Sequence, residues 1–216
     1  MVNITKDNFS IRQICESGQC FRLKKLEGVD ARQKEKAEKG LASEKYALTA
    51  LGQYLEIEQR ENQLFFDCTL EEFEGIWRRY FDLEEDYARI MGMIDPEDAY
   101  LLKAAAYGSG IRILRQDLWE MIISFIVSQQ NNIVRIRKCI ENLCEKYGEE
   151  KRLKDGRKYY LFPTPEALAK ASIEELYACN LGYRSKYIHK TSGSVAFGEV
   201  DLEAIKQMDY KAAMNE

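Results

Sequence analysis

The spacing of apolar residues changes along the chain, from a period of two to the longer period of a helix. Short runs in the first third alternate apolar and polar side chains, as strands with one buried face do. The predicted strands are residues 19–26, 45–51, 53–59 and 64–68. Glu61-Asn62 predicts the hairpin turn that joins the last two strands. The Lys- and Glu-rich residues 27–44 predict an exposed loop at the first connection.

From Thr69 onward the pattern is helical, and capping residues stand at the expected helix starts. Thr69 followed by Glu72 is a capping box that opens a helix to about Tyr80. Eight of the ten positions from Leu118 to Val127 are apolar, so the helix that begins after Asp117 is expected to be buried on every side. The other predicted elements are helices at 84–93, 97–107, 133–147 and 183–197, shorter helices after Pro165 and Ser172, a basic loop or short hairpin at 149–163, and a helix from Asp209 that the chain does not complete.

An alternating first part followed by an almost purely helical second part indicates an α+β fold. We expect residues 1–113 to form an antiparallel β-sheet module and residues 114–216 to form a helical domain that ends early. With 216 residues, of which 45% are hydrophobic, the chain has enough apolar content for a core. The sequence shows no internal repeats.

Charge is distributed unevenly along the chain. The net charge of -4 argues mildly against nucleic acid as a partner. Residues 111–190, however, hold 15 Lys and Arg against 10 Asp and Glu, a net of +5, between flanks of -6 and -3. A positive middle between negative flanks is compatible with a local phosphate-binding face.

The six cysteines and the single histidine exclude several kinds of site. No two cysteines form a C-x-x-C pair, so we expect no metal, no iron–sulfur cluster and no other cofactor. Because no signal peptide or membrane-length apolar run is visible, we expect a cytoplasmic protein with reduced thiols and no membrane partner. A cysteine hydrolase built on Cys20 is not expected, because His189 lies about 170 residues away and no third member is evident.

The most informative stretch is Gln129-Gln130-Asn131-Asn132, at the end of the apolar helix. Four consecutive amides are costly there unless the protein or a ligand hydrogen-bonds them. Asn131 or Asn132 can cap the helix that begins at Ile133. One interpretation is therefore a well-capped helix corner, and the other is a site where a ligand pairs with the amides.

The stretch continues to Arg135, and Ser128-Gln-Gln-Asn-Asn-Ile-Val-Arg135 resembles the Ser-Ser-Asn-Asn-Asn-Ile-Ala-Arg motif of the 8-oxoguanine DNA glycosylases. Three more segments resemble this family in the same order: Ser17-Gly18-Gln19-Cys20-Phe21-Arg22, residues 111–117, and Leu181-Gly182-Tyr183-Arg184 with Tyr187. The resemblance covers residues 2–210. It implies a TATA-binding-protein-like N-terminal module, then part of a helix–hairpin–helix glycosylase domain. It also implies a monomer that acts on double-stranded DNA containing oxidised guanine.

The resemblance further implies how the DNA is read. An enzyme that acts on a base within a duplex must extrude it, which leaves the partner base orphaned. An orphan cytosine presents two acceptors, which suit the donors of Arg135 and Arg184, and one donor, which suits the amide oxygen of Gln130. The family has an asparagine at the position of Gln130. Asn131 and Asn132 are expected to hold the helix corner and nearby backbone rather than to read bases. The alternative is that both arginines lie on solvated helix faces.

Tyr183 and Gly18 are the remaining expected contacts. Tyr183 stands at the start of a helix, where an aromatic ring can wedge against a base step; the alternative is a core tyrosine, as expected for Tyr187 one turn later. 8-Oxoguanine has an N7–H donor where guanine has an acceptor, so a backbone carbonyl aimed at N7 distinguishes the two. The resemblance implies that Gly18 plays this part, since glycine permits close backbone approach. The alternative is a helix C-cap glycine, and both roles can hold together.

No catalytic residue is assigned. The family's chemistry uses a lysine on the helix after a Gly-x-Gly hairpin, and residues 199–216 contain no such hairpin. We interpret Lys211 as an exposed helix lysine rather than as a desolvated nucleophile. We therefore expect the N-terminal part of a base-excision repair glycosylase with AP-lyase activity, inactive by itself. The rivals are a non-catalytic DNA-binding or protein-interaction module that lost its active site, and a generic helical scaffold.

Overall fold

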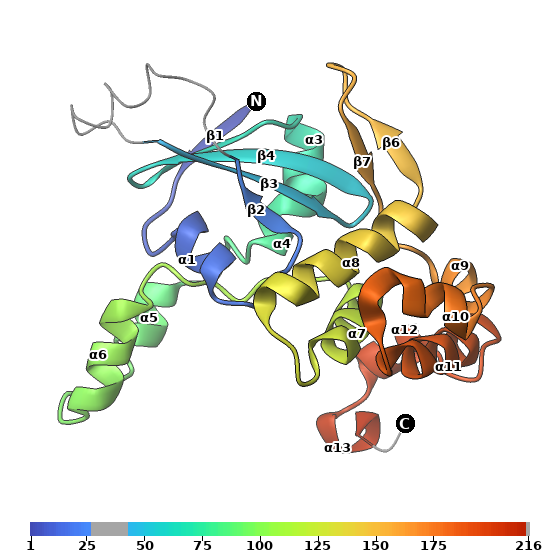
Figure 1. The fold of residues 1–216 in the computed structure, drawn as a ribbon. Helices are drawn as coiled ribbons and strands as arrows, with labels where there is room; N and C mark the ends of the chain where they lie inside the picture. The colour runs from blue at the N-terminus through green and yellow to red at the C-terminus, as the bar shows by residue number, and fades with distance from the viewer. Residues whose placement is uncertain (27–42, 215–216) are drawn as a thin grey trace. The chain divides into compact units, whose positions relative to one another are not determined.

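The computed structural model describes residues 1–26 and 43–214, which form two compact units (Figure 1). The first unit is Met1–Arg115 and the second is Gln116–Glu216. Most of the loop predicted at residues 27–44 lies outside the described residues. The α+β class is confirmed, because a five-stranded antiparallel sheet is followed by helices.

The sheet of the first unit has the strand order β1-β5-β4-β3-β2, with every pair antiparallel. Its strands are β1 (Val2–Thr5), β2 (Leu23–Lys25), β3 (Glu44–Ala50), β4 (Gln53–Arg60) and β5 (Gln63–Phe66). The hairpin predicted at Glu61-Asn62 is confirmed, and Glu61 there adopts a positive φ of 51°. The predicted strand 19–26 was too long, since only its last part pairs with β3 and residues 19–22 form a loop. Strand β1 was not predicted.

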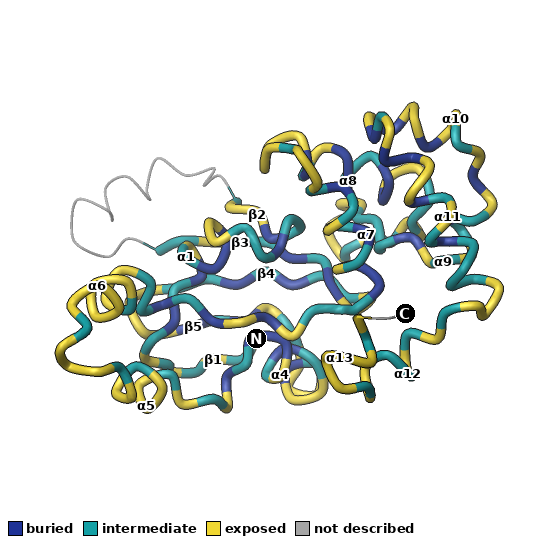
Figure 2. The backbone as a smooth tube through the Cα atoms, turned by 90° about the horizontal axis from the view of Figure 1, so that it is seen from below, coloured by how far each residue is buried: buried dark blue, intermediate teal, exposed yellow. Residues whose placement is uncertain are grey.

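One face of this sheet carries the core of the first unit, which Figure 2 shows as dark blue segments. Two helical segments supply the opposing side chains: α1 (Ile11–Glu16), and a continuous helical run made of α3 (Leu70–Glu72), a π-helical turn (Phe73–Trp77) and α4 (Arg78–Tyr80). Both side-chain and backbone bonds of the predicted Thr69/Glu72 capping box are present. Aromatic rings from the run pack edge-to-face on the sheet, with the Phe66 and Phe73 centroids 5.0 Å apart.

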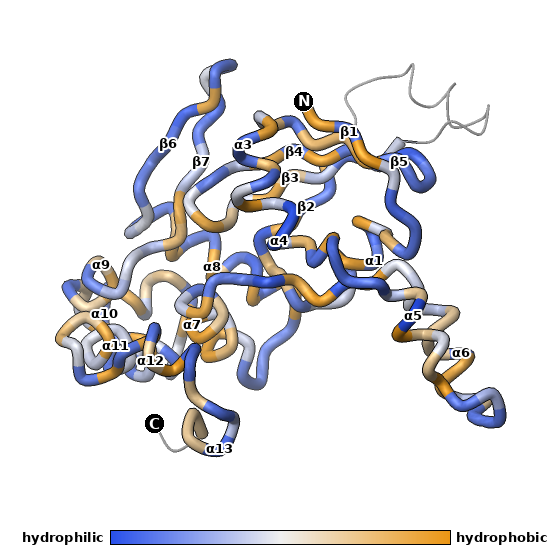
Figure 3. The backbone as a smooth tube through the Cα atoms, turned by 180° about the vertical axis from the view of Figure 1, so that it is seen from behind, coloured by the Kyte–Doolittle hydropathy of each residue, from blue (hydrophilic) through white to orange (hydrophobic). Residues whose placement is uncertain are grey.

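Two further helices of the first unit contribute nothing to the core. They are α5 (Tyr87–Met91) and α6 (Ala99–Tyr107), shorter than the predicted 84–93 and 97–107. Neither contains a buried residue, although α6 is largely apolar (Figure 3). From the end of α6, residues 108–115 lead the chain back past α1 as irregular backbone.

The second unit is helical apart from one small hairpin. Its elements are α7 (Leu118–Ser128), α8 (Ile133–Tyr147), β6 (Glu150–Arg152), β7 (Lys158–Tyr160), α9 (Pro165–Ala169), α10 (Ile173–Leu176), a π-helical turn η2 (Tyr177–Leu181), α11 (Arg184–Ala196), α12 (Leu202–Gln207) and α13 (Tyr210–Ala213). The hairpin within 149–163 and the Asp209 cap are confirmed. None of the helices among the described residues is long and apolar enough to cross a membrane.

The prediction that the helix after Asp117 is buried on every side is wrong. In α7 one face is buried, through Trp119, Ile123 and Val127, whereas Met121 is 44% and Phe125 is 69% exposed. The polar Glu120 is buried instead. The apolar content of this helix therefore exceeds what the second unit covers.

Candidate nucleic-acid interface

The side-chain amides of Asn131 and Asn132 hold the corner between α7 and α8, which spans Gln129–Asn132. Asn131 donates from Nδ2 to the Val127 carbonyl at 3.0 Å, which satisfies an acceptor at the end of α7. Asn132 caps α8, since its Oδ1 accepts from the Arg135 backbone N–H at 3.0 Å. Both asparagines thus hold the helix corner, as the sequence led us to expect.

The two glutamines differ from the asparagines in what their backbone does. Gln130 adopts a positive φ of 48°, and both glutamine side chains are exposed. This left-handed turn directs the carbonyls of Gln129 and Gln130 toward α11, where side chains of that helix donate to them. The corner therefore presents main-chain acceptors to α11, whereas its two glutamine side chains are exposed.

Arg184 donates hydrogen bonds to these main-chain acceptors. It is only 4% exposed, and Nε donates to the Gln129 carbonyl at 3.0 Å. Nη2 donates to the carbonyls of Gln129 and Gln130, and Nη1 donates to the Leu181 carbonyl at 3.3 Å. The expected alternative of a solvated helix face is wrong for Arg184. Its guanidinium group ties the start of α11 to the α7–α8 corner.

Arg135 lies on the exposed side of the same corner. Burial raises the pKa of the Cys139 thiol above its usual value, and the positive charges of Arg135 and Arg184 offset only part of this rise. The thiol itself donates to the Asn180 carbonyl at 3.3 Å. Both guanidinium groups therefore lie near this thiol in the second unit, and their sharing of one base stays a prediction.

Tyr183 stands beside this pair, with its side chain 52% exposed. Its hydroxyl donates to the Gln129 carbonyl at 3.4 Å, and the Arg184 guanidinium carbon lies 4.6 Å from the ring centroid. The prediction of a core position for Tyr187 is wrong, because it is 58% exposed. The two tyrosine rings meet edge-to-face with centroids 6.3 Å apart. Two aromatic rings, rather than one, therefore face solvent here.

Local backbone conformation explains why Tyr183 and Arg184 start α11 at this point. Asn180 adopts a φ of 65°, and Gly182 has a φ of 59° and a ψ of -136°. The conformation of Gly182 is open only to a residue without a Cβ. The Gly182 carbonyl then accepts from the backbone N–H and the hydroxyl of Ser185, which fixes the first turn of α11.

Gly18 belongs to the first unit and follows the last turn of α1. The Ser17 N–H bonds to the Gln13 carbonyl, and Gly18 adopts a φ of 78°, as a glycine directly after a helix C-cap often does. Its C-cap role is therefore confirmed, and its role toward a lesion stays a prediction.

Comparison with known proteins gives these residues a context. Residues 1–122 match the N-terminal domain of 8-oxoguanine DNA glycosylase, and residues 123–214 match the HhH-GPD superfamily of base excision DNA repair proteins. The chain belongs to the 8-oxoguanine DNA glycosylase family. The matches meet at residues 122 and 123, the two units at 115 and 116, and the boundary expected from the sequence lay at 113 and 114.

Individual relatives of the family are similar over nearly the whole chain. An N-glycosylase/DNA lyase of Saccharomyces cerevisiae is 33% identical over 210 residues, which are 96% of this chain and 55% of the yeast protein. The 8-oxoguanine glycosylase/lyase of Clostridium acetobutylicum, in complex with double-stranded DNA containing cytosine opposite 8-oxoguanine, is 34% identical with a TM-score of 0.83. That match covers 94% of this chain and 64% of the clostridial chain. The chain thus spans between half and two thirds of the length of these relatives.

In the part of the chain that the structure describes, no lysine lies in the buried setting that the family's lysine chemistry needs. None of the lysines among residues 1–26 and 43–214 is buried, and Lys211 is exposed in α13. The same residues contain no group of three or more His, Cys, Asp or Glu that could hold a metal ion. Cys20 and His189, weighed above as a hydrolase pair, have structural partners: Cys20 contacts the Tyr80 hydroxyl and His189 the Ala171 carbonyl.

Sequence reasoning missed two parts of the corner. The Gln129 carbonyl, which receives donors from Tyr183 and Arg184, carries no sequence signal, because every residue has a carbonyl. Cys139 was not singled out, although it lies one helical turn after Arg135 in α8. That spacing could have placed a thiol beside the guanidinium group.

Proposed function

We propose that the complete protein removes 8-oxoguanine paired with cytosine from duplex DNA, with an accompanying AP-lyase step, and that residues 1–216 alone do not. Membership of the 8-oxoguanine DNA glycosylase family and the activities for which its relatives are named support this reaction class. The observation that carries the proposal is that Arg184 and Tyr183 both bond to the Gln129 carbonyl, with the exposed Arg135 in the first turn of α8, directly after the same corner. Positive charge and an exposed aromatic ring suit a base that has lost its partner.

The two arginines take unequal parts in this proposal. All three guanidinium nitrogens of Arg184 already donate to main-chain carbonyls, so its first task is to hold the corner. Arg135 is exposed and supplies the donors for the O2 and N3 acceptors of cytosine. Gln130, also exposed, supplies the amide oxygen for the cytosine amino group. An orphan adenine has a different donor and acceptor pattern and would leave arginine donors unpaired.

Tyr183 and Gly18 complete the proposed recognition. The ring of Tyr183 wedges into the stack beside the orphan base, where Tyr187 supports it from the side. The Gly18 carbonyl accepts from N7–H of 8-oxoguanine and faces the N7 lone pair of guanine, so the lesion is favoured. Both roles draw on exposed or half-buried positions of the chain.

Excision by the full-length gene product tests the proposal. Duplexes with 8-oxoguanine opposite cytosine should be cleaved faster than duplexes with 8-oxoguanine opposite adenine, and undamaged duplexes should not be cleaved. Replacing Arg135 with alanine should reduce the preference for cytosine by roughly tenfold, since a good base contact discriminates by about 1–3 kcal/mol. Lys138→Ala is the matched control, because Lys138 is an exposed cation of α8 that pairs with Glu141 at 3.8 Å. Equal loss in both variants would show a general charge effect and contradict base reading.

A non-catalytic DNA-binding module is the second candidate, favoured by the absence of a buried lysine among the described residues. This candidate predicts that the protein binds the lesion-containing duplex but releases no 8-oxoguanine at any protein concentration. Release of the free base, measured by chromatography, separates the two candidates.

A further inference from the structure

Residues 108–115 of the first unit form an irregular segment, called here the strap, whose backbone is bound both by main-chain groups and by side chains. Most of the side-chain bonds come from two glutamines, Gln13 in α1 and Gln19 in the loop that follows. Gln13 donates from Nε2 to the Tyr107 carbonyl at 2.8 Å, and its Oε1 accepts from the Gly110 N–H at 2.8 Å. There is also no room for a side chain at Gly110, because a Cβ there would lie 2.4 Å from the Ser10 Cβ. The start of the strap is thereby fixed against α1.

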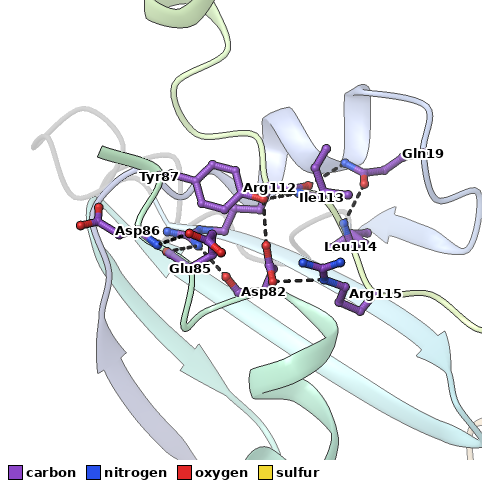
Figure 4. Close-up of polar contacts among 9 residues, drawn as sticks. All are labelled: Gln19, Asp82, Glu85, Asp86, Tyr87, Arg112, Ile113, Leu114 and Arg115. Carbon is purple, nitrogen blue, oxygen red and sulfur yellow. Dashed lines mark hydrogen bonds and ion pairs between the residues drawn. The ribbon is translucent and has the colours of Figure 1, made fainter. Parts of the chain in front are cut away.

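Gln19 repeats this pattern further along the strap. Its Nε2 donates to the Arg112 carbonyl at 2.9 Å, and its Oε1 accepts from the Leu114 N–H at 2.9 Å (Figure 4). The same Nε2 also donates to the Ser17 hydroxyl at 3.1 Å. The side-chain amide therefore pairs with the strap as a neighbouring strand would, and it reaches back across Gly18 to Ser17.

The strap is a firm anchor for this pairing because Arg112 is almost fully buried, with 1% exposure. Its guanidinium group stacks on the Tyr87 ring at 4.4 Å and donates to four main-chain carbonyls. These are the carbonyls of Asp7, Asn8, Asp82 and Glu85. Tyr87 in turn accepts from the Ile113 N–H at 2.8 Å and donates to Asp82 at 3.0 Å (Figure 4). Displacing the strap would break all of these bonds together.

Gly18 sits between anchored neighbours in the loop from α1 to β2. Ser17 donates from its hydroxyl to the Ile14 carbonyl at 2.7 Å, and Cys20 is buried against the Tyr80 hydroxyl. Glycine restricts rotation about its backbone bonds less than any other residue does. The direction of the Gly18 carbonyl therefore depends on how firmly Ser17 and Gln19 are held.

We propose that Gln19 is a positioning residue that aims the Gly18 carbonyl by pairing with the strap, and so sets the discrimination between 8-oxoguanine and guanine. This inference rests on the proposed function for its substrate. Gln19 touches no reacting atom in the proposal. It acts through the peptide between Gly18 and Gln19, whose plane turns if the side chain is released.

Gln19→Met and Gln13→Met in the full-length gene product form a matched pair. Methionine nearly keeps the volume of glutamine but removes the side-chain hydrogen bonds, which join Gln19 to Arg112 and Leu114, and Gln13 to Tyr107 and Gly110. Amide hydrogen exchange should rise at Leu114 in the first variant and at Gly110 in the second. Only Gln19→Met should lower the preference for 8-oxoguanine over guanine opposite cytosine, by roughly tenfold in competitive duplex binding. Strand cleavage at a preformed abasic site, which needs no base sensing, should stay within about twofold of wild type.

The readouts keep the possible failures apart. Faster exchange at Leu114 with unchanged lesion preference would overturn the proposal, because the loop that carries Gly18 would then be released from the strap with no effect on lesion recognition. Unchanged exchange at Leu114 and at residues 17–20 would overturn it too, because Gln19 would hold nothing. Equal loss of lesion preference in Gln13→Met would assign the effect to the strap as a whole and also contradict a specific role of Gln19. A wild type without lesion preference refutes the proposed function, and the exchange data alone then decide whether Gln19 holds the loop.

Discussion

Arg135 and Arg184 lie at one corner of the second unit but differ in what surrounds them. Arg184 is buried and bonded to the carbonyls of Gln129, Gln130 and Leu181, whereas Arg135 is exposed. A buried carbonyl without a donor costs about 1–3 kcal/mol, and hydrogen bonds to charged groups are the stronger ones. The sequence placed both arginines in one functional class, and the structure separates them by burial.

We predict that Arg184→Met lowers the free energy of unfolding of the second unit by about 3 kcal/mol, because the Gln130 and Leu181 carbonyls lose the Arg184 donor and the Gln129 carbonyl keeps only that of Tyr183. Arg135→Ala should change it by less than about 0.5 kcal/mol, as an exposed substitution does. Urea denaturation followed by tryptophan fluorescence measures both, since Trp119 is buried in this unit. A similar loss in the two variants would mean that Arg135 also supports the corner.

The identity of the candidate site could be predicted from the sequence, but its geometry could not. Gln130, Arg135, Tyr183 and Arg184 were found by resemblance of short motifs, and the structure brings most of them to one corner. Whether a guanidinium group points inward depends on carbonyls such as that of Gln129, which only the folded backbone places. The exposure of Tyr187 escaped notice for the same reason, since its spacing after Tyr183 suits a core face as well as a solvated one.

At the scale of elements, helix starts were predicted best because their signals are local. The caps at Thr69, Asn132 and Asp209 all bond as expected, each within three residues along the chain. Strand β1 was missed because four residues give too short an alternation to read. The exposed face of α7 could not be predicted either, because an almost wholly apolar helix has no polar stripe that indicates which face is exposed to solvent.

Asn132 allows the two roles of the corner to be tested separately. Asn132→Ala should destabilise the second unit by about 1 kcal/mol, because α8 loses its N-cap. Asn132→Asp should keep the stability, since aspartate caps equally well and favours the helix dipole. The same aspartate should weaken duplex binding, because it adds negative charge beside Arg135 where the proposal places DNA. Urea denaturation and fluorescence anisotropy with a labelled duplex measure the two effects. Undiminished DNA binding by the aspartate variant would locate the DNA elsewhere.

For the molecule as a whole, the α+β division was predictable because a period of two and a period of 3.6 are easily told apart. The distribution of charge was less informative. Residues 111–190 are positive as a group, yet many of these charges are paired locally, such as Lys158 with Glu150 at 2.8 Å. A net count along the sequence therefore does not identify the cations that remain for a phosphate backbone.

The last prediction concerns residues 1–216 taken alone. A lysine that attacks C1′ of the sugar must be largely neutral, which requires burial or nearby positive charge. No lysine of residues 1–26 and 43–214 is buried, so we expect no covalent adduct when this chain is treated with borohydride in the presence of an 8-oxoguanine:cytosine duplex. Gel electrophoresis under denaturing conditions detects such an adduct. If one forms, peptide mapping would identify the lysine, and Lys211→Ala would show whether the exposed lysine of α13 is the nucleophile after all.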